Sequence, residues 1–505
     1  MVSSSPALDR FFAELRAALG DDAVNRSDET LTRYGENKLP GGDRRPAAVL
    51  LPASVEDVEA IVRAANAHGV VLYPISTGQN QGMGLRSAVH AGQVVVDLGR
   101  RMNRILELDD TLAYAVVEPG VTYQQLYDEL GVRGHKLMLD TTSGPPQGGV
   151  LGNTMDSGAG YTPYFDHLYM SCGMEVVLGN GQRLRTGDGA LPGAKAWHVS
   201  KYSIGPKLDG LFVQSNFGIT TRLGVWLMPR PPCIRGFFFS FPDDDDLEQI
   251  VELCRPLKLA NMVPTLFKLT NDVYAFGTEC VQPEYAANGG RLTLSDGARR
   301  ELQQRYGTGS WLVSGAFYGA SEAALVPFIE RIKAHFLRSG KATYIDHDSA
   351  EANPMLRIHL DSFRGVPTVD ELKLLGWRPG GGLIWFLPGT PMVGKIANAH
   401  QRLARRIYTE HGFEYICEYV AGARFARGLH VLVYNREDEA ERNRADACYR
   451  ALAEAFAAAG YSVGRAATGY HALHMAQLDP VFTEVVKALK ASFDPRGVIA
   501  AGKYQ

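Results

Sequence analysis

Residues 70–84 read Val-Val-Leu-Tyr-Pro-Ile-Ser-Thr-Gly-Gln-Asn-Gln-Gly-Met-Gly. The apolar stretch 70–75 predicts a strand, and the loop after it places three glycines among small polar residues. Such a loop presents several backbone N–H groups in a concave nest that suits a pyrophosphate. It lacks the third glycine that the Rossmann fingerprint requires at a fixed spacing, and it lacks the Lys-Ser/Thr pair of a P-loop. A plain glycine-rich turn remains the alternative for this loop taken alone.

The sequence around this loop alternates helix and strand signals. Ser54 and Asp57 form a plausible capping box for a helix that Gly69 would close. Further strands are predicted at 93–98, 113–117, 174–178 and 219–228, with a hairpin turn at 179–181. The prolines at 229, 231 and 232 mark a change of pattern that is typical of a domain boundary.

The remainder of the chain predicts a second α+β unit. Strands are expected at 237–241 and 430–434, and helices at 398–411, 438–459 and 480–492. Asn398 is the expected N-cap of the first of these helices.

Composition restricts the class of protein. The chain has 505 residues, 52 Lys+Arg against 55 Asp+Glu and 45% hydrophobic residues, which is typical of a globular enzyme. The near-neutral charge argues against a nucleic acid or a membrane surface as partner. No signal peptide or run of about 18 apolar residues is recognisable. The six cysteines include no CxxC pair, so we expect buried thiols in a reducing, cytoplasmic compartment.

Several motifs in fixed order then point to one family. After loop 76–84 come Val-Val-Glu-Pro-Gly-Val at 116–121, Gly-Asn-Thr-Met-Asp-Ser-Gly at 152–158 and Ser-Asn-Phe-Gly-Ile-Thr at 215–220. With Gly-Tyr-Thr-Pro-Tyr at 160–164 and Asp-Pro-Arg-Gly at 494–497, this series resembles the vanillyl-alcohol oxidase/para-cresol methylhydroxylase family over essentially the whole chain.

The resemblance implies an α+β, two-domain flavoprotein. An FAD-binding domain of para-cresol methylhydroxylase type would span 1–230, an α+β cap with the substrate pocket 231–459, and a segment completing the FAD domain 460–505. A substrate carbon would transfer hydride to flavin N5. The implied FAD contacts are Ile75, Ser76, Thr77, Gly78, Gln79, Asn80, Gly82, Met83, Pro119, Gly120, Gly152, Asn153, Asp156, Gly158, Ile219, Thr220, Arg465 and Lys503.

The sequence departs from the family in the substrate pocket. Phenol-oxidising members bind the phenolate with two tyrosines and an arginine, and here Met83 and Gly464 occupy the tyrosine positions while Arg465 remains. In the cap the family's glutamate is Glu418, but a histidine pair is replaced by Arg427 and Gly428. Arg427 reads either as a surface or salt-bridged arginine, or as a fork for a substrate carboxylate.

Two further positions bear on the flavin. Relatives attach FAD covalently through His or Tyr near the stretch 374–393, which here contains no His, Tyr or Cys, so non-covalent FAD is expected. His471 and His474 read as structural. Asp156 matches an acid that lies near flavin N5 in some relatives, where it would act as a base or tune the flavin; a turn-capping role is the alternative. Lys503 would lie by the flavin pyrimidine.

These features lead to one preferred function and two alternatives. We expect an FAD-dependent oxidoreductase with Asp156, Glu418, Arg427 and Arg465 as catalytic residues. Its substrate would be a carboxylate-bearing natural-product intermediate, with possible oxidative decarboxylation to an alkene. The runner-up is a phenol or benzylic-alcohol oxidase or dehydrogenase in which Tyr161, Tyr419 or Tyr470 replaces the missing donors. A flavin-binding protein without catalysis is the third reading. We also expect a homodimer, and dioxygen or a redox partner as the electron acceptor. We expect no metal.

Overall fold

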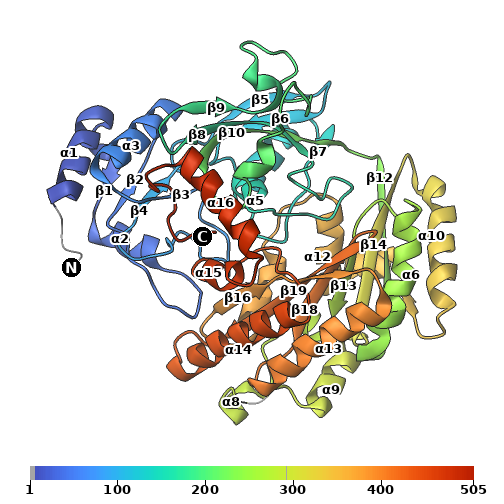
Figure 1. Ribbon diagram of the computed structural model, residues 1–505. Coiled ribbons are helices and arrows are strands. Elements are labelled where there is room, and N and C mark those ends of the chain that lie inside the picture. The colour runs from blue at the N-terminus through green and yellow to red at the C-terminus, as the bar shows by residue number, and fades with distance from the viewer. Residues whose placement is uncertain (1–5, 292, 505) are drawn as a thin grey trace.

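The structure is a computed structural model that describes residues 6–291 and 293–504 (Figure 1). Its N-terminal part begins with a four-stranded sheet in the order β1-β2-β4-β3. Strands β2 and β3 run parallel to β4, so β3 delivers loop 76–84 at the edge of this sheet. The elements are α1 (Pro6–Leu19), β1 (Val24–Asn25), α2 (Asp28–Gly35), β2 (Ala48–Leu50), α3 (Val55–His68), β3 (Leu72–Ile75) and β4 (Val94–Asp97).

Helix α3 begins and ends where the sequence predicts. The Ser54 side chain accepts a hydrogen bond from the Asp57 N–H, and Gly69 closes the helix in the left-handed conformation at φ 67°. A residue with a Cβ is strained in that conformation, which explains the glycine. The buried face of α3 carries Val58, Ile61 and Val62 against the sheet.

A five-stranded antiparallel sheet follows, in the order β5-β6-β10-β8-β9. The predicted turn at 179–181 joins β8 to β9 as a hairpin. This part contains β5 (Ile105–Asp109), β6 (Tyr114–Val117), α4 (Tyr123–Val132), β7 (Leu137–Met138), α5 (Val150–Met155), β8 (Ser171–Leu178), β9 (Arg183–Arg185), β10 (Gly218–Trp226) and β11 (Met228–Pro229). The predicted strands are thus present, with ends moved by a few residues.

The cap is built on one eight-stranded sheet, with β15-β12-β14-β13-β18-β19-β16 in order and β17 paired to β19. Phe237, Phe239 and Phe241 of β12 face a core that includes residues of α6 and α13, whereas Phe238 faces α12, as the period of two in a strand requires. Its strands are β12 (Cys233–Phe241), β13 (Phe267–Asn271), β14 (Trp311–Gly319), β15 (Thr343–Ile345), β16 (Gly382–Phe386), β17 (Gly389–Pro391), β18 (Ile416–Ala421) and β19 (Phe425–Tyr434).

Helices lie around this sheet, with α13 and α14 side by side (Figure 1). They are α6 (Leu247–Leu259), α7 (Asp272–Gly277), α8 (Tyr285–Asn288), α9 (Asp296–Tyr306), α10 (Glu322–Leu337), α11 (His347–Ala352), α12 (Pro354–Phe363), α13 (Gly394–Glu410) and α14 (Glu439–Ala458). The 3-10 helices of the chain are η1 (Asp21–Ala23), η2 (Gly187–Ala190), η3 (Asp209–Phe212), η4 (Asp244–Asp246) and η5 (Asp370–Trp377).

After the cap the chain returns to the N-terminal part through α15 (His471–Met475) and α16 (Pro480–Phe493). Figure 1 shows α16 beside α5 and the N-terminal sheets. Phe493 packs against Phe212 and Phe217, and Ile499 forms a parallel bridge with Leu72 of β3. The limits 1–230, 231–459 and 460–505 stay a prediction.

One local expectation was wrong. Asn398 does not cap α13, because the helix starts at Gly394, whose N–H donates to the Glu252 carboxylate. Asn398 therefore lies inside the helix, where its side-chain oxygen accepts from Gln401. The carboxylate that replaces the cap lies 142 residues away in sequence, beyond the reach of a local motif.

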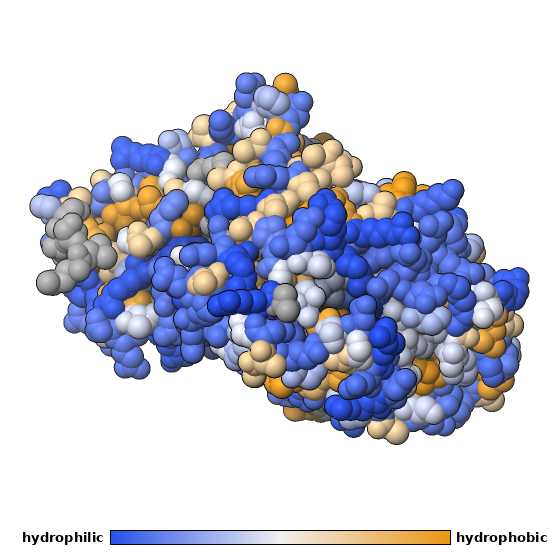
Figure 2. Space-filling view, turned by 90° about the horizontal axis from the view of Figure 1, so that it is seen from below, coloured by the Kyte–Doolittle hydropathy of each residue, from blue (hydrophilic) through white to orange (hydrophobic). Residues whose placement is uncertain are grey.

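Figure 2 shows one face of the molecule, which is mainly polar. On the face shown in Figure 2 hydrophilic residues predominate and apolar residues form small separate groups. Within the described residues, no helix combines the length and apolar character needed to cross a bilayer. Cys172, Cys254, Cys417 and Cys448 are buried free thiols as expected, but Cys233 and Cys280 are partly exposed.

Candidate active site

Loop 76–84 has the geometry of an anion nest. Gly78, Gly82 and Gly84 adopt φ angles of 62°, 70° and 123°, values that favour glycine. Within the described chain, the backbone N–H groups of residues 77–80 donate to no protein acceptor. A run of unpaired N–H groups in a turn is a site for phosphate oxygens. This loop therefore fits a pyrophosphate. A plain glycine-rich turn would not need a run of N–H groups without acceptors.

Two further predicted segments pack against this loop. The Ser76 hydroxyl donates to the Pro119 carbonyl at 2.6 Å. A Cβ on Gly152 would lie 2.7 Å from the Cβ of Ser76, and one on Gly120 would lie 2.3 Å from the Gly99 carbonyl oxygen. Gly152 thus allows helix α5 to approach the loop, Gly120 allows the 119–120 turn to approach residue 99, and the Ser76 hydroxyl links the loop to that turn.

The other end of the loop meets the cap. The Trp385 indole N–H donates to the Gln81 carbonyl at 2.9 Å, and a Cβ on Gly82 would lie 2.6 Å from Cδ1 of Trp385. The Met83 side chain is buried in the core of the cap, and the Thr468 hydroxyl donates to its carbonyl. Gly82 is therefore required for contact with the cap, a reason that the sequence did not suggest.

Asp156, the C-cap residue of α5, is held at both carboxylate oxygens. Arg465 donates to Oδ2 from Nη2 at 2.6 Å and from Nε at 2.8 Å, and the Tyr504 hydroxyl donates to Oδ1 at 3.0 Å. Lys503 Nζ lies 3.9 Å from Oδ1. Burial alone would raise the pKa of Asp156, but Arg465 and Lys503 outweigh it and hold that pKa well below its usual range. This fixed carboxylate is a poor base, and its partners are not those of a turn cap.

Arg427 is half-buried on β19 and lies over the α-carbon of Gly464. A Cβ on Gly464 would be 2.6 Å from Cζ of Arg427. Burial and then the nearby charge of Arg465 lower the pKa of Arg427, with Asp166 opposing them. Among the described residues no carboxylate lies within salt-bridge distance of its guanidinium. The salt-bridged reading of Arg427 thus finds no partner among the described residues, and Gly464 leaves the space that the Arg427 guanidinium fills.

Glu418 belongs to a buried polar cluster. Thr270 donates to it at 2.9 Å and Tyr161 at 3.3 Å, and Lys268 Nζ lies 3.4 Å from Glu418 Oε2 and 3.2 Å from Glu371 Oε1. The pKa of Glu418 is raised by burial and by Glu371, against the effect of Lys268. Lys268 and Glu371 were missed from the sequence. The signal for Lys268 was a lysine between Phe267 and Leu269, in a strand whose residues are all buried.

The three tyrosines of the runner-up reading lie in different places. The Tyr161 hydroxyl contacts Ser143 and Glu418. Tyr419 is buried in the cap core and bonds to His400, and Tyr470 donates to Asp446. Of the three, Tyr161 alone faces a predicted site residue.

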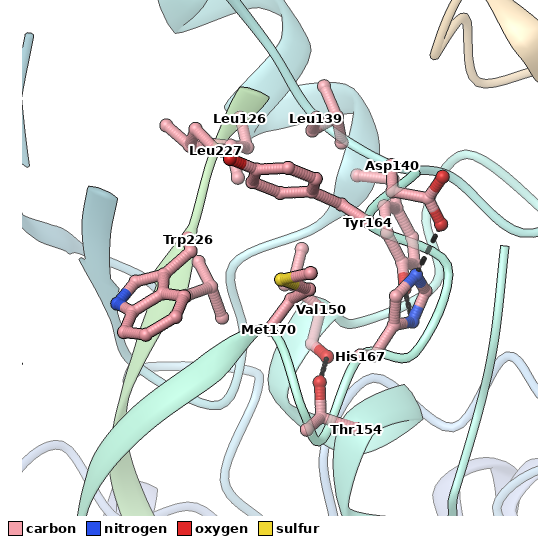
Figure 3. Close-up of a pocket in the computed structure, with 12 residues that line it drawn as sticks. Leu126, Leu139, Asp140, Val150, Thr154, Tyr164, His167, Met170, Trp226 and Leu227 are labelled. Atoms are coloured by element: carbon pink, nitrogen blue, oxygen red, sulfur yellow. Dashed lines mark hydrogen bonds and ion pairs between the residues drawn. The ribbon is translucent and has the colours of Figure 1, made fainter. Parts of the chain in front are cut away.

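The remaining predicted contacts lie around α5. The Thr220 hydroxyl contacts the Met155 sulfur at 3.2 Å, and the Ile219 side chain is buried in the adjoining core. Asn153 Oδ1 lies 2.6 Å from Nδ1 of His167 and leaves no room for a Cβ on Gly158. Figure 3 shows His167 beside Asp140 at a cavity of about 30 Å³, which has room for a water but for no substrate.

The chain is similar to known proteins in sequence and in fold. The FAD binding domain family matches residues 46–187. The flavoprotein subunit of 4-cresol dehydrogenase (hydroxylating) from Pseudomonas putida is 34% identical, with 97% of this chain and 94% of the relative covered. The chain belongs to the vanillyl-alcohol oxidase/para-cresol methylhydroxylase family. It is an FAD-dependent oxidoreductase.

Two other proteins are similar to this chain over almost its whole length. The 1'-carboxy-chondrochloren decarboxylase of Chondromyces crocatus is 34% identical, with 98% of this chain and 97% of the relative covered. The crystal structure of p-cresol methylhydroxylase with substrate bound superposes with a TM-score of 0.96 at 33% identity, over 100% of this chain and 98% of the other. The two-domain fold expected from the sequence is thereby confirmed. The roles of the individual residues stay predictions.

Proposed function

We propose that this enzyme oxidises a small molecule bearing a carboxylate, and that Arg427 binds that carboxylate. The observation that carries the proposal is the half-buried guanidinium of Arg427, which has no carboxylate partner among the described residues. A buried charge without a partner is costly, whereas the planar fork of arginine matches a carboxylate bidentately. FAD supplies the hydride acceptor when bound.

We propose a role for Arg465 that differs from the one expected from the sequence. It already shares its charge with Asp156 at 2.6 Å, so it is at best a second donor to the substrate. The two arginines repel one another, and an anion between them would relieve that repulsion. We therefore assign the main recognition of the substrate carboxylate to Arg427.

The chemistry extends naturally to oxidative decarboxylation. When hydride leaves the carbon β to the carboxylate, the bond between the α-carbon and the carboxylate can break. Its electron pair then forms the alkene, and CO₂ departs. The 34% identity to a named decarboxylase supports this reading, because that relative is covered almost completely.

The proposal is tested with 3-phenylpropionate and its methyl ester as probes of flavin reduction. Arg427→Ala should lower kcat/KM for the acid by about 30-fold or more, since truncating one partner of a buried charged pair costs about 2–5 kcal/mol. The wild-type enzyme should react poorly with the ester, and the variant should lose little further. Arg424→Ala, an exposed arginine before the same strand, is the matched control.

The alternative is oxidation of a phenol or benzylic alcohol. The Tyr161 hydroxyl near Glu418 favours it, as do relatives named for cresol. If p-cresol or vanillyl alcohol reduces the wild-type flavin efficiently, or if the ester reacts as fast as the acid, the carboxylate assignment is wrong. We further propose a homodimer, a cytoplasmic location, and dioxygen or a redox partner as acceptor.

A further inference from the structure

We propose that Tyr504 is a positioning residue that sets the orientation and effective charge of Asp156 toward the flavin. This inference rests on the proposed placement of Asp156 beside the flavin. The expected contacts at this end of the chain stopped at Lys503, and neither the family motifs nor the substrate pocket includes Tyr504.

The segment that carries Tyr504 is attached firmly to the FAD-binding part. Leu72 of β3 exchanges backbone hydrogen bonds with this segment, donating to the Val498 carbonyl and accepting from the Ala500 N–H. The Gln93 side chain donates to the Ala501 carbonyl at 2.9 Å, and Lys490 donates to the Ile499 carbonyl at 2.8 Å. The segment therefore delivers Tyr504 from a fixed backbone.

The side chain of Tyr504 is placed as precisely as its backbone. Its ring packs edge-on against His471, with ring centroids 4.5 Å apart. Its hydroxyl donates to Asp156 Oδ1 at 3.0 Å. Burial and the Asp156 charge raise the pKa of Tyr504 well above its usual value, so the phenol keeps the proton that it donates.

Tyr504 and Arg465 divide the Asp156 carboxylate between them. Arg465 donates to Oδ2, and among the hydrogen bonds of the described residues Tyr504 is the neutral donor to Oδ1, from which Lys503 Nζ lies 3.9 Å away. Two donors on different oxygens define the plane of the carboxylate, whereas one leaves it free to rotate. A donated hydrogen bond also draws negative charge away from the acceptor oxygen.

The sign of the effect on the flavin follows. A negative charge beside the flavin disfavours its reduced, anionic form, as a neighbouring cation favours it. Tyr504→Phe leaves the carboxylate charge undiminished, so the midpoint potential of bound FAD should become more negative. Asp156→Asn removes that charge, so the potential should become more positive. A residue that only supports the fold would not produce these opposite shifts.

The test measures the midpoint potential and visible spectrum of bound FAD in the holoenzyme. The variants are Tyr504→Phe, Asp156→Asn and, as matched control, Tyr202→Phe, whose side chain is 78% exposed. We expect shifts of opposite sign in the first two, none in the control, and normal FAD content in Tyr504→Phe.

The outcomes separate this inference from the proposed function. If Asp156→Asn shifts the potential and Tyr504→Phe matches the wild-type enzyme, or shifts it in the same direction, the inference about Tyr504 is overturned. If neither variant changes the potential or the spectrum, Asp156 does not lie at the flavin, and the proposed site is overturned with it.

Discussion

At Gly464 the space that a side chain would need is taken by the guanidinium of Arg427. The two positions belong to different segments, 37 residues apart. The family resemblance implies a histidine and a tyrosine at the corresponding positions of phenol-oxidising members. If the resemblance holds at these positions, the loss of the tyrosine and the gain of the arginine are one change in three dimensions, because the Arg427 guanidinium takes the space beside Gly464.

Gly464→Ala tests that relation at the scale of one methyl group. The new Cβ would lie 2.6 Å from Cζ of Arg427, so the guanidinium must move. Because a hydrogen bond to a charged group contributes about 1.5–3 kcal/mol, kcat/KM for 3-phenylpropionate should fall by about 10- to 100-fold. Gly210→Ala is the control, since a Cβ there meets nothing within 4 Å. Unchanged turnover of the acid would show that Arg427 does not bind it.

The buried cluster around Glu418 predicts a pH dependence of stability. Because the pKa of Glu418 is raised from 4.5 to about 7, the folded protein holds this proton more tightly than the unfolded chain. The corresponding stability is complete below pH 4.5 and is lost as pH rises through about 7. Glu418→Gln should therefore gain thermal stability relative to the wild-type protein between pH 5 and pH 8, by roughly 1–3 kcal/mol.

Melting temperatures across this pH range provide the measurement. Glu454→Gln, a neutralised carboxylate on the exposed face of α14, is the control and should show a constant difference from the wild-type protein. A difference for Glu418→Gln that stays flat with pH would mean that Glu418 keeps its ordinary titration.

Among the elements, loop 76–84 has two functions at its two ends. The N–H groups of residues 77–80 donate to no acceptor among the described residues, whereas Gln81 and Gly82 pack against Trp385 of β16. The loop therefore connects the phosphate nest with the cap. Gly78 and Gly82 differ in what they approach, because a Cβ on Gly78 would meet Arg86 instead of the cap.

Gly82→Val should yield protein with little FAD and a largely intact fold. A side chain at φ 70° is strained and would collide with Trp385, so the loop must leave its position. Flavin absorbance per protein after purification is the measurement. Gly42→Val has a similar φ of 73° with nothing within 4 Å, and separates backbone strain from the collision. Full flavin occupancy in Gly82→Val would show that the loop does not hold the cofactor.

At the scale of the whole molecule, the site is assembled where three parts of the chain meet. Asp156 and Arg465 are 309 residues apart, and Tyr504 lies a further 39 residues along the chain. The cap contributes Glu418 and Arg427 from neighbouring strands β18 and β19. The proposed cofactor site thus draws on contacts between these parts, and residues 374–393 contain no His, Tyr or Cys that could attach the flavin covalently.

Acid precipitation checks this absence of covalent attachment. With no His, Tyr or Cys in residues 374–393, the yellow colour should remain in the supernatant, and peptides should carry no flavin mass. Colour retained in the protein pellet would mean that a residue elsewhere in the chain forms the bond.

Local signals in the sequence were sufficient for much of the fold. The sequence predicts the cap of α3 at Ser54, the end of that helix at Gly69 and the glycine positions of loop 76–84. Each of these features depends on residues within a few positions along the chain. The family motifs extended this to the cofactor and the two-domain architecture. The prediction that Asn398 caps α13 was wrong, because a distant carboxylate, Glu252, accepts from the first residue of that helix in place of a local cap.

The chemistry of the pocket was decided by tertiary structure. The sequence identified Asp156, Glu418, Arg427 and Arg465 as candidates, but it assigned both arginines to the substrate. Only the fold pairs Arg465 with Asp156 and, within the part of the chain that the structure describes, leaves Arg427 without a carboxylate, because ion pairing depends on distance in space and not along the chain. The same reason hid Lys268, Glu371 and Tyr504, whose neighbours lie about 100 to 350 residues away in sequence.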